Sequence, residues 1–281
     1  MASIALADLH THTYYSDGGD SPERVIHMAK DAGLSAIAIT DHDILDGHPE
    51  AAEAAKRHGL ELVPGIEMSA AVKDIEVHVL GFFIDGRHAA LQALLAEQRD
   101  RRMRRMHDMV GKLQAIGLSI TVEDVMAVAG KGTMGRPHVA EALVRRKHVA
   151  TLREAFDRYI GANGPAFIPG SSLAPKTVIQ LIRQAGGVPV LAHPMYLKND
   201  NLIDEFVRDG LVGLEVYHSS HTPELVKRYE QIAKRLGLLM TGGTDYHGKA
   251  KEGLPIGSTT VPYSLVDGLK QWKLTHAPTS A

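Results

Sequence analysis

Histidines and carboxylates gather in six short stretches of the sequence, most of them directly after an apolar run. They occupy residues 8–12 with 16–18, then 40–43, 64–67, 76–79, 192–194 and 243–247. Imidazole and carboxylate ligands without thiolates suit manganese, zinc or iron(II), whereas magnesium alone favours a site made of oxygen ligands. The chemistry that these residue types predict is therefore that of a divalent metal centre.

The pair His10 and His12 shows what the spacing achieves. Two residues apart at the end of an extended segment, both rings point to the same side and can hold one ion. A single His-x-His pair is weak evidence in a chain with 16 histidines, and any one of these residues alone is more often structural or on the surface. Six stretches that follow in order along the chain instead favour one shared site.

The elements that must position these stretches are short apolar strands that alternate with helical segments. We expect strands at residues 4–7, 35–40, 60–65, 75–83, 187–192, 212–216 and 238–241, and helices at 22–32, 48–58, 175–185, 201–209 and 223–236. Repeated strand–helix units with short loops predict a mostly parallel α/β sheet covered by helices, and about seven strands suit a closed or distorted barrel. Polar residues that follow such strands meet at one edge of the fold.

The middle of the chain has a different pattern. Helical segments are expected at 91–116, 122–129, 136–146 and 152–159. We interpret residues 90–169 as a helical insertion that caps the substrate, residues 1–89 and 170–272 as the barrel, and residues 273–281 as a loose tail. The first of these helices carries five arginines that form either an RNA-binding track or a solvated face: Arg99, Arg101, Arg102, Arg104 and Arg105.

Composition excludes several classes of protein. The 281 residues, 44% of them hydrophobic, allow one sizeable core, and a net charge of -2 gives no argument for a general nucleic-acid or membrane-surface protein. The absence of cysteine excludes disulfides, thiolate nucleophiles and cysteine-rich zinc sites. We see neither a secretory signal nor an apolar run long enough for a membrane span. We therefore expect a cytoplasmic protein without membrane association, and nothing indicates an obligatory protein partner.

The ordered motifs resemble those of the PHP (polymerase and histidinol phosphatase) family over nearly the whole chain. They read Asp8-Leu9-His10-Thr11-His12, Ser16-Asp17-Gly18, Thr40-Asp41-His42-Asp43, Pro64-Gly65-Ile66-Glu67, His78, Ala192-His193-Pro194 and Thr244-Asp245-Tyr246-His247. The resemblance implies a distorted seven-stranded (β/α) barrel of the PHP type. It also implies two or three divalent metal ions, foremost Mn²⁺, with Zn²⁺ or Fe²⁺ as alternatives.

The same resemblance assigns nine metal ligands, one of which bridges two ions. The first ion would be held by His10, His12, Glu67 and Asp245, the second by Glu67, His78 and His193, and the third by Asp17, His42 and His247. Asp17 stands where some members have histidine, which would retune the third site. Three further carboxylates are expected to orient the histidine rings: Asp8, Asp41 and Asp43.

Weaker motifs resemble a nucleotide-specific subgroup, namely Gly135-Arg136-Pro137-His138 and Glu215-Val216-Tyr217-His218. This subgroup includes 3',5'-nucleotide bisphosphate phosphatases and a 5'-to-3' exoribonuclease. We expect Arg136 to anchor a phosphate, because a guanidinium matches phosphate oxygens bidentately, unless it is a surface arginine beside a helix start. His218 would protonate the leaving oxygen or serve structure alone. The remaining predicted substrate contacts are His138, Lys176 and Thr244.

The leading function is hydrolysis of a phosphate ester of a nucleotide, foremost the 3'-phosphate of a 3',5'-nucleotide bisphosphate. The alternatives are a 5'-to-3' exoribonuclease that acts on short RNA, a cyclic sugar-phosphate phosphodiesterase, and a non-catalytic module in which the metals support structure. Amide or lactone hydrolysis on a similar barrel would need no phosphate-binding arginine. The expected binding partner is accordingly a small nucleotide or the end of a short RNA.

Overall fold

The computed structural model describes residues 5–73, 75–130, 132–170, 172–248 and 254–276. A sheet of eight strands forms the centre of the molecule, in the order β7-β6-β5-β4-β3-β2-β1-β8. Its strands are β1 (Leu6–Asp8), β2 (Ala36–Ile39), β3 (Glu61–Val72), β4 (Ile75–Phe82), β5 (Val188–Leu191), β6 (Gly213–His218), β7 (Leu239–Gly243) and β8 (Val261–Pro262). The sheet curls into a nearly closed barrel. Its two sides meet where Leu9 N, just after β1, donates to Gly242 O of β7 at 3.1 Å.

Strand directions are mixed around β4. The pairs β1–β2, β2–β3, β5–β6 and β6–β7 are parallel, whereas β4 runs antiparallel to both of its neighbours. The turn that joins β3 to β4 is too short for a crossover helix, so these two strands form a hairpin. The predicted seven-stranded barrel is thus confirmed as β1 to β7, and the two-residue β8 adds an antiparallel partner to β1.

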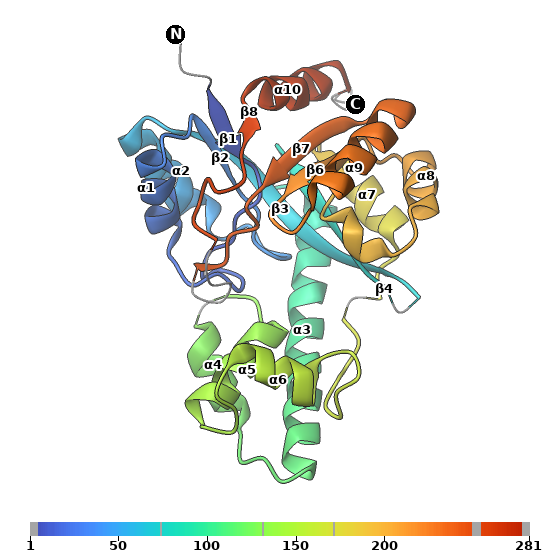
Figure 1. The fold of residues 1–281 in the computed structure, drawn as a ribbon. Helices are drawn as coiled ribbons and strands as arrows, with labels where there is room; N and C mark the ends of the chain where they lie inside the picture. The colour runs from blue at the N-terminus through green and yellow to red at the C-terminus, as the bar shows by residue number, and fades with distance from the viewer. Residues whose placement is uncertain (1–4, 74, 131, 171, 249–253, 277–281) are drawn as a thin grey trace.

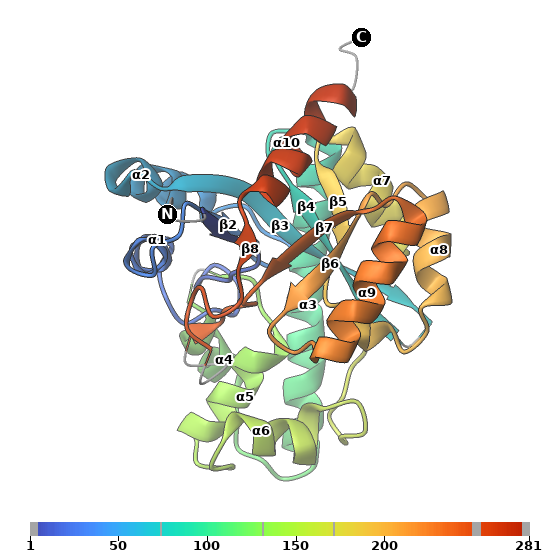
Figure 2. The ribbon, with the colours of Figure 1, turned by 45° about the horizontal axis from the view of Figure 1, so that its top comes forward.

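Helices cover the outside of the barrel. They are α1 (Pro22–Asp31), α2 (His48–His58), α7 (Pro175–Gln184), α8 (Asn201–Arg208), α9 (Pro223–Leu236) and α10 (Ser264–His276). Figure 2 shows α1 and α2 on one side of the strands and α7, α8 and α9 on the other. Because helices cover the sheet, β2 and β5 are buried at every position, as their unbroken apolar sequences require.

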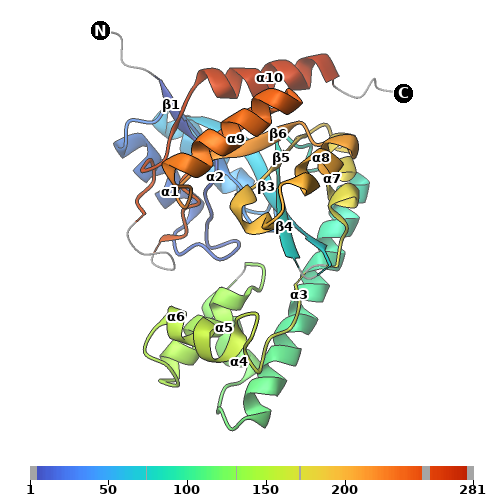
Figure 3. The same cartoon turned by 45° about the vertical axis from the view of Figure 1, so that its right-hand side comes forward.

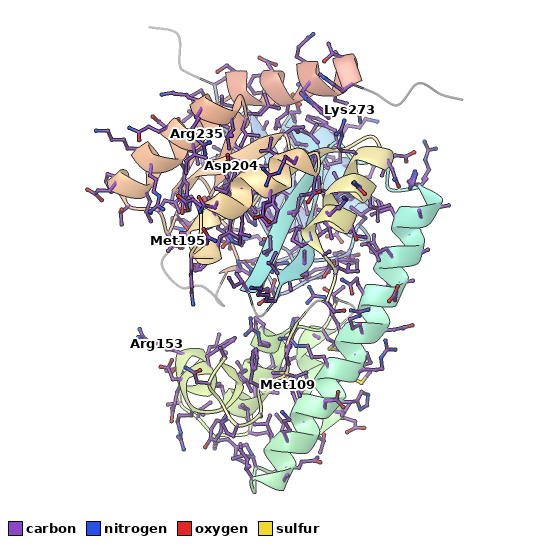
Figure 4. All side chains as sticks on the ribbon, turned by 90° about the vertical axis from the view of Figure 1, so that its right-hand side faces the viewer. Met109, Arg153, Met195, Asp204, Arg235 and Lys273 are labelled. Atoms are coloured by element: carbon purple, nitrogen blue, oxygen red, sulfur yellow. The ribbon has the colours of Figure 1, made fainter. Side chains whose placement is uncertain are left out.

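The inserted segment forms a second, helical layer below the barrel (Figure 1). It contains α3 (Ala89–Ala115), α4 (Val122–Ala129), α5 (Arg136–Arg145), α6 (Leu152–Ala155) and the π-helix η1 (Phe156–Ile160). Its helices share a hydrophobic core of their own, to which Met109 points from α3 (Figure 4). The first turns of α3 pack instead into the barrel core through Leu91 and Leu95, so one helix belongs to both layers (Figure 3).

The C-terminal region departs from the prediction of a loose tail that begins at residue 273. Helix α10 continues to His276, and Lys273 Nζ donates to Phe83 O of the barrel. Residues 277–281 lie outside the described part of the chain. No helix within the described residues is both long and apolar enough to cross a membrane.

Candidate metal centre and active site

The nine predicted ligands come together at one end of the barrel. His10, His12 and Asp17 follow β1, His42 follows β2, Glu67 and His78 lie on β3 and β4, His193 follows β5, and Asp245 and His247 follow β7. Four groups of these side chains, with His218 in one of them, bring their ligand atoms within 4.8 Å of one another. Parallel strands that end at the same edge therefore deliver residues from the whole length of the chain to one site.

Glu67 lies at the middle of the cluster, where its two carboxylate oxygens face different histidine rings. Oε2 lies 3.1 Å from both His10 Nε2 and His12 Nε2 and 3.3 Å from His42 Nδ1, while Oε1 lies 2.8 Å from His78 Nδ1 and 2.9 Å from His193 Nε2. This is the arrangement that a carboxylate needs in order to bridge two cations. It agrees with the bridging role that the resemblance assigned to Glu67.

Asp17 faces a second set of rings on the other side of His12. Its Oδ1 lies 3.3 Å from His247 Nε2, 3.8 Å from His42 Nε2 and 3.9 Å from His12 Nδ1. These four residues form one of the groups that could hold an ion. The third predicted site thus gains His12, which the prediction had placed only in the first.

Several buried ligand atoms make no hydrogen bond of good geometry within the described chain. They are His12 Nε2, Asp17 Oδ1, His42 Nδ1 and His78 Nε2. A buried polar atom without such a bond costs free energy; the first three face other ligand side chains at 3.1 to 3.3 Å, and His78 Nε2 lies 3.7 Å from Glu76 Oε1. Divalent cations would satisfy them, so the residues present fit the two or three metal ions that the sequence predicts.

Burial and charge act in opposite directions on the carboxyl groups of the site. Burial alone would raise the pKa values of Glu67, Asp17 and Asp245. The surrounding imidazoles outweigh it and hold all three pKa values well below their usual range. All three carboxylates are therefore ionised at neutral pH, as metal ligands must be.

The histidine rings divide into two kinds. Burial lowers the pKa of His42 to about 3, and it also lowers the pKa of His193, so both rings are neutral and ready to bind metal. Burial acts the same way on His12 and His78, but hydrogen bonds and charge from the neighbouring carboxylates outweigh it and raise these pKa values to about 9 and about 10. An arriving cation must displace the protons from those two rings.

Glu215 orients the His10 ring and holds the backbone of His193, a role that the sequence analysis missed. It is fully buried on β6, its Oε1 lies 2.9 Å from His10 Nδ1, and its Oε2 accepts from His193 N at 2.7 Å. Burial would raise its pKa, yet His10 and His218 hold that pKa at about 2. A carboxylate on Nδ1 turns Nε2 of His10 toward the metal site.

A β-bulge hides Glu215 from sequence analysis. Along an ordinary strand, residues 215 and 218 face opposite sides. The register of β6 against β7 shifts between Glu215 and Tyr217, and this extra residue brings Glu215 and His218 to the same site. The only signal in the sequence was the motif that contains both residues.

The three carboxylates that we expected to orient histidine rings bind loops instead. Asp8 accepts from Thr244 N and Oγ1, Asp41 from Thr13 N and Oγ1 and from Ser16 Oγ, and Asp43 from Ser69 N and Arg102. Asp41 reaches a ring only through Ser16, whose Oγ lies 3.4 Å from His12 Nδ1. Each carboxylate accepts from a backbone N–H group close to it in the fold, from Thr244 for Asp8, Thr13 for Asp41 and Ser69 for Asp43, and these groups satisfy it first.

The metal ligands form one wall of a cavity of about 840 Å³. The opposite wall comes from the insertion and includes Arg136, Leu152, Arg153, Phe156 and Phe167. Arg136 Nη2 donates to Glu76 Oε2 at 2.9 Å, and its guanidinium lies 5.8 and 5.9 Å from the ring centroids of Phe156 and Phe167. The predicted phosphate anchor is thus held at the cavity by one carboxylate and two aromatic faces.

His218 lies beside the cluster with its orientation fixed. Ser220 N donates to His218 Nδ1 at 3.1 Å, so the proton of the neutral ring is on Nε2, 3.3 Å from Asp245 Oδ2. His218 is nearly fully buried. This tautomer offers a hydrogen-bond donor at the site; a neutral imidazole releases its proton too reluctantly to act as the predicted acid, so a hydrogen bond to the leaving oxygen is the role that this geometry favours.

The other three predicted substrate contacts are not among the residues that line the cavity. His138 Nδ1 accepts from Gly135 N at 3.0 Å and caps α5, while the hydroxyl of the fully buried Thr244 donates to Asp8. Lys176 is exposed and lies 3.5 Å from Asp209. Each has a structural partner elsewhere, so Arg136 is the one predicted contact that we retain.

The arginine-rich stretch of α3 is not a free basic track. Four of its five arginines have partners within the protein: Arg99 pairs with Asp46, Arg101 with Glu97, Arg102 with Asp43, and Arg105 Nε donates to Ile168 O. Their guanidinium groups join the insertion to the barrel and to itself. The interpretation as an RNA-binding track is therefore not supported.

A helix-covered barrel whose edge collects histidines and carboxylates around a bridging glutamate defines a metal-dependent hydrolase. The family model of the PHP domain matches residues 8–165, and the chain belongs to this family of metal-dependent phosphoesterases.

Named relatives cover most of the chain. It is 32% identical over 265 residues to the 3',5'-nucleoside bisphosphate phosphatase of Chromobacterium violaceum, covering 92% of each chain. It is also 32% identical over 245 residues to the 5'-3' exoribonuclease of Haemophilus influenzae, covering 85% of this chain and 89% of the relative. A solved structure from Bifidobacterium adolescentis, described as a proposed metal-dependent phosphoesterase, superposes with a TM-score of 0.88 at 37% identity over 94% of both chains.

Proposed function

We propose that the protein removes the 3'-phosphate from a nucleoside 3',5'-bisphosphate. The observation that carries this proposal is the shared cavity, with the metal ligands on one wall and Arg136 between aromatic rings on the other. Its volume of about 840 Å³ lies within the range of roughly 300–1,000 Å³ for small-molecule sites. A bisphosphate would place one phosphate at each wall, with its base near Phe156 and Phe167.

Divalent ions bound at the cluster would neutralise the phosphate and lower the pKa of a bound water toward about 7. The protein's own residues would bind the ions and orient the groups around them. Glu67, Asp17 and Asp245 provide the negative charge that retains the cations, and Glu215 fixes the His10 ring. His218 presents Nε2–H at the site and would donate a hydrogen bond to the leaving oxygen as that oxygen gains charge, with the proton itself taken from water.

Arg136 would recognise the phosphate that is not cleaved. Burial raises the pKa of Glu76, but His78 and Arg136 outweigh it and hold that pKa well below its usual value, so Glu76 is a charged partner for the guanidinium. The incoming phosphate either binds Arg136 together with the Glu76 carboxylate or takes the place of that carboxylate. The aromatic rings keep the guanidinium in place during this exchange.

The test compares substrates with and without the second phosphate. Mn²⁺-loaded protein is given adenosine 3',5'-bisphosphate, AMP, a 5'-phosphorylated RNA tetramer and p-nitrophenyl phosphate, and the products are measured. We expect the bisphosphate to lose phosphate fastest. We also expect Arg136→Ala to raise KM for the bisphosphate about 10- to 100-fold, in line with a lost charged hydrogen bond, with little effect on p-nitrophenyl phosphate.

Arg153→Ala is the matched control, because Arg153 lines the same cavity but its side chain is 90% exposed. Equal losses on both substrates in Arg136→Ala would contradict an anchoring role. Stepwise release of mononucleotides from the tetramer would instead support the second candidate, an exoribonuclease, which the Haemophilus influenzae relative favours. Turnover of none of the four by metal-loaded protein would contradict both and favour cyclic or sugar phosphates.

A further inference from the structure

Arg102 reaches from the inserted helix α3 to the barrel loop that follows β2. Its Nε and Nη2 donate to Asp43 Oδ2 at 2.9 and 2.5 Å, and Nη2 also donates to Ser69 Oγ at 2.9 Å. The side chains of Arg102 and Asp43 are only 16% and 1% exposed. Removal of one partner from such a buried pair leaves the other charge uncompensated, so this contact strongly favours the present position of the loop.

Asp43 directly follows the metal ligand His42 and has an unusual backbone conformation. Its φ is 53°, in the left-handed region that residues other than glycine rarely adopt. Its surroundings hold it there: Asp43 N donates to Glu67 O at 3.0 Å, and its Oδ1 accepts from Ser69 N at 2.9 Å. The backbone direction at Asp43 decides where the preceding ring points, so Arg102 acts on His42 through Asp43.

A second contact from the insertion holds His42 itself. Thr133 Oγ1 donates to His42 O at 3.0 Å, and Thr133 N donates to Tyr15 O at 2.8 Å. Tyr15 belongs to the loop that carries Asp17. The insertion thus touches two of the three barrel loops that supply ligands to the third site.

His42 does not serve all parts of the cluster equally. It belongs to the group with His12, Asp17 and His247 and to the group with Glu67 and His78. The group of His10, His12 and Glu67 does not use it. A displaced His42 would therefore remove a ligand from the third site and from the group of Glu67 and His78, and leave the first site complete.

We propose that Arg102 is a positioning residue for the third metal site, with Thr133 as its partner, so that the insertion completes a site whose ligands all come from the barrel. The proposal rests on the metal cluster of the proposed function. It also gives the arginine-rich stretch a role other than nucleic-acid binding.

The experiment counts and titrates metal in the full chain. Chelator-stripped protein is titrated with Mn²⁺ by calorimetry, and bound manganese is counted by mass spectrometry after gel filtration. We expect Arg102→Met to weaken the last ion bound about 10- to 100-fold, the usual effect of losing a residue that supports a ligand, while the ion held by His10, His12 and Glu67 binds as in the wild type. Thr133→Val removes one neutral hydrogen bond and should weaken the same ion about fivefold.

The control is Arg104→Met, which removes an exposed arginine from the same helix and should leave every ion unchanged. The proposal is overturned if folded Arg102→Met binds all ions as the wild type does, or loses them all alike. If Arg102→Met does not fold, as judged by circular dichroism, Thr133→Val decides, and an unchanged last ion overturns the proposal. Wild-type protein that binds metal and cleaves substrate confines such a failure to this inference, whereas wild type that binds no Mn²⁺ refutes the proposed function itself.

Discussion

At the scale of single residues, the site depends on which atom of each ring is free. His10 faces the cluster with Nε2 because Glu215 lies against its Nδ1, and His218 holds a proton on Nε2 because a backbone N–H occupies its Nδ1. Glu215 and this backbone N–H group therefore decide which nitrogen of the His10 ring faces the metal site and which nitrogen of the His218 ring donates a hydrogen bond.

The tautomer of His218 leads to a prediction about leaving groups. Replacement of His218 by Ala should lower kcat for a nucleotide 3'-phosphate about 10²- to 10³-fold, because the ribose oxygen loses a hydrogen-bond donor while it gains charge as it leaves. The loss should be far smaller for p-nitrophenyl phosphate, whose leaving group is stable as an anion. Steady-state kinetics on both substrates test this, with the manganese content measured in parallel. A loss of metal in His218→Ala would show that the ring is a ligand and not a hydrogen-bond donor to the leaving group.

At the scale of elements, close contacts between strands hold the ligands in register. A Cβ on Gly243, the last residue of β7, would lie 2.4 Å from His10 N and 2.8 Å from Asp8 Oδ1. The end of β7 can therefore approach the end of β1 only without a side chain. That approach brings Asp245 within 3.5 Å of the His10 ring.

Two glycine substitutions should consequently have opposite effects. We expect Gly243→Ala to lower the free energy of unfolding by about 2–4 kcal/mol and to weaken metal binding, because the added methyl group would clash with the backbone of His10. Gly111→Ala, near the C-terminal end of α3 with open space around it, should raise the free energy of unfolding by about 0.5–1 kcal/mol. Urea unfolding of both variants measures the difference. A neutral Gly243→Ala would mean that β1 and β7 can separate without cost.

The elements also show what the sequence could predict. Helices α2, α4 and α9 have their predicted bounds, because caps, prolines and apolar spacing mark both ends of each. Strand β3 runs to Val72, well beyond the predicted end at 65, since Glu67 and Ser69 interrupt its apolar run while the hairpin with β4 continues the pairing. Helix α10 was not predicted, because it buries only Val266 and Leu269 and shows little apolar periodicity.

The site divides in the same way. The nine candidate ligands could be named from the sequence because their short motifs resemble those of a known family, and the structure brings them to one end of the barrel. Glu215 could be placed beside them only once the β-bulge was known. The structural partners of Thr244 and Lys176 depend on residues distant in sequence, Asp8 and Asp209, so no local pattern could reveal them.

At the scale of the whole molecule, a dense group of buried ionisable side chains closes the end of the barrel. The carboxylates Glu67, Asp17 and Asp245 have lowered pKa values, and three of its rings, His10, His12 and His78, have raised ones. Cations that bind the folded chain alone stabilise it by about 2.7 kcal/mol for each site at a concentration 100 times Kd. Folding, metal binding and proton release are therefore linked.

The linkage fixes the direction of a pH effect. His12 and His78, with pKa values of about 9 and about 10, hold protons at pH 7 that a metal must displace. Affinity for Mn²⁺ should therefore rise as the pH is raised from 6 toward 9, and binding should release protons. Calorimetry in buffers of different ionisation enthalpy counts these protons. Chelation should lower Tm more at pH 8 than at pH 6; an equal loss at both values would contradict the assignment of these rings as ligands.

The metal ligands and the facing cavity wall lie on different segments of the chain, and this has a consequence for how the protein can evolve. Every predicted metal ligand lies on the barrel, and the cavity wall opposite them belongs largely to a segment that leaves after β4 and returns at β5. Such a segment can lengthen, shorten or change its lining residues over generations while the hydrolytic chemistry passes on unchanged. Arg102 and Thr133 mark the limit of that freedom, because a descendant that alters them also alters the loop presenting His42.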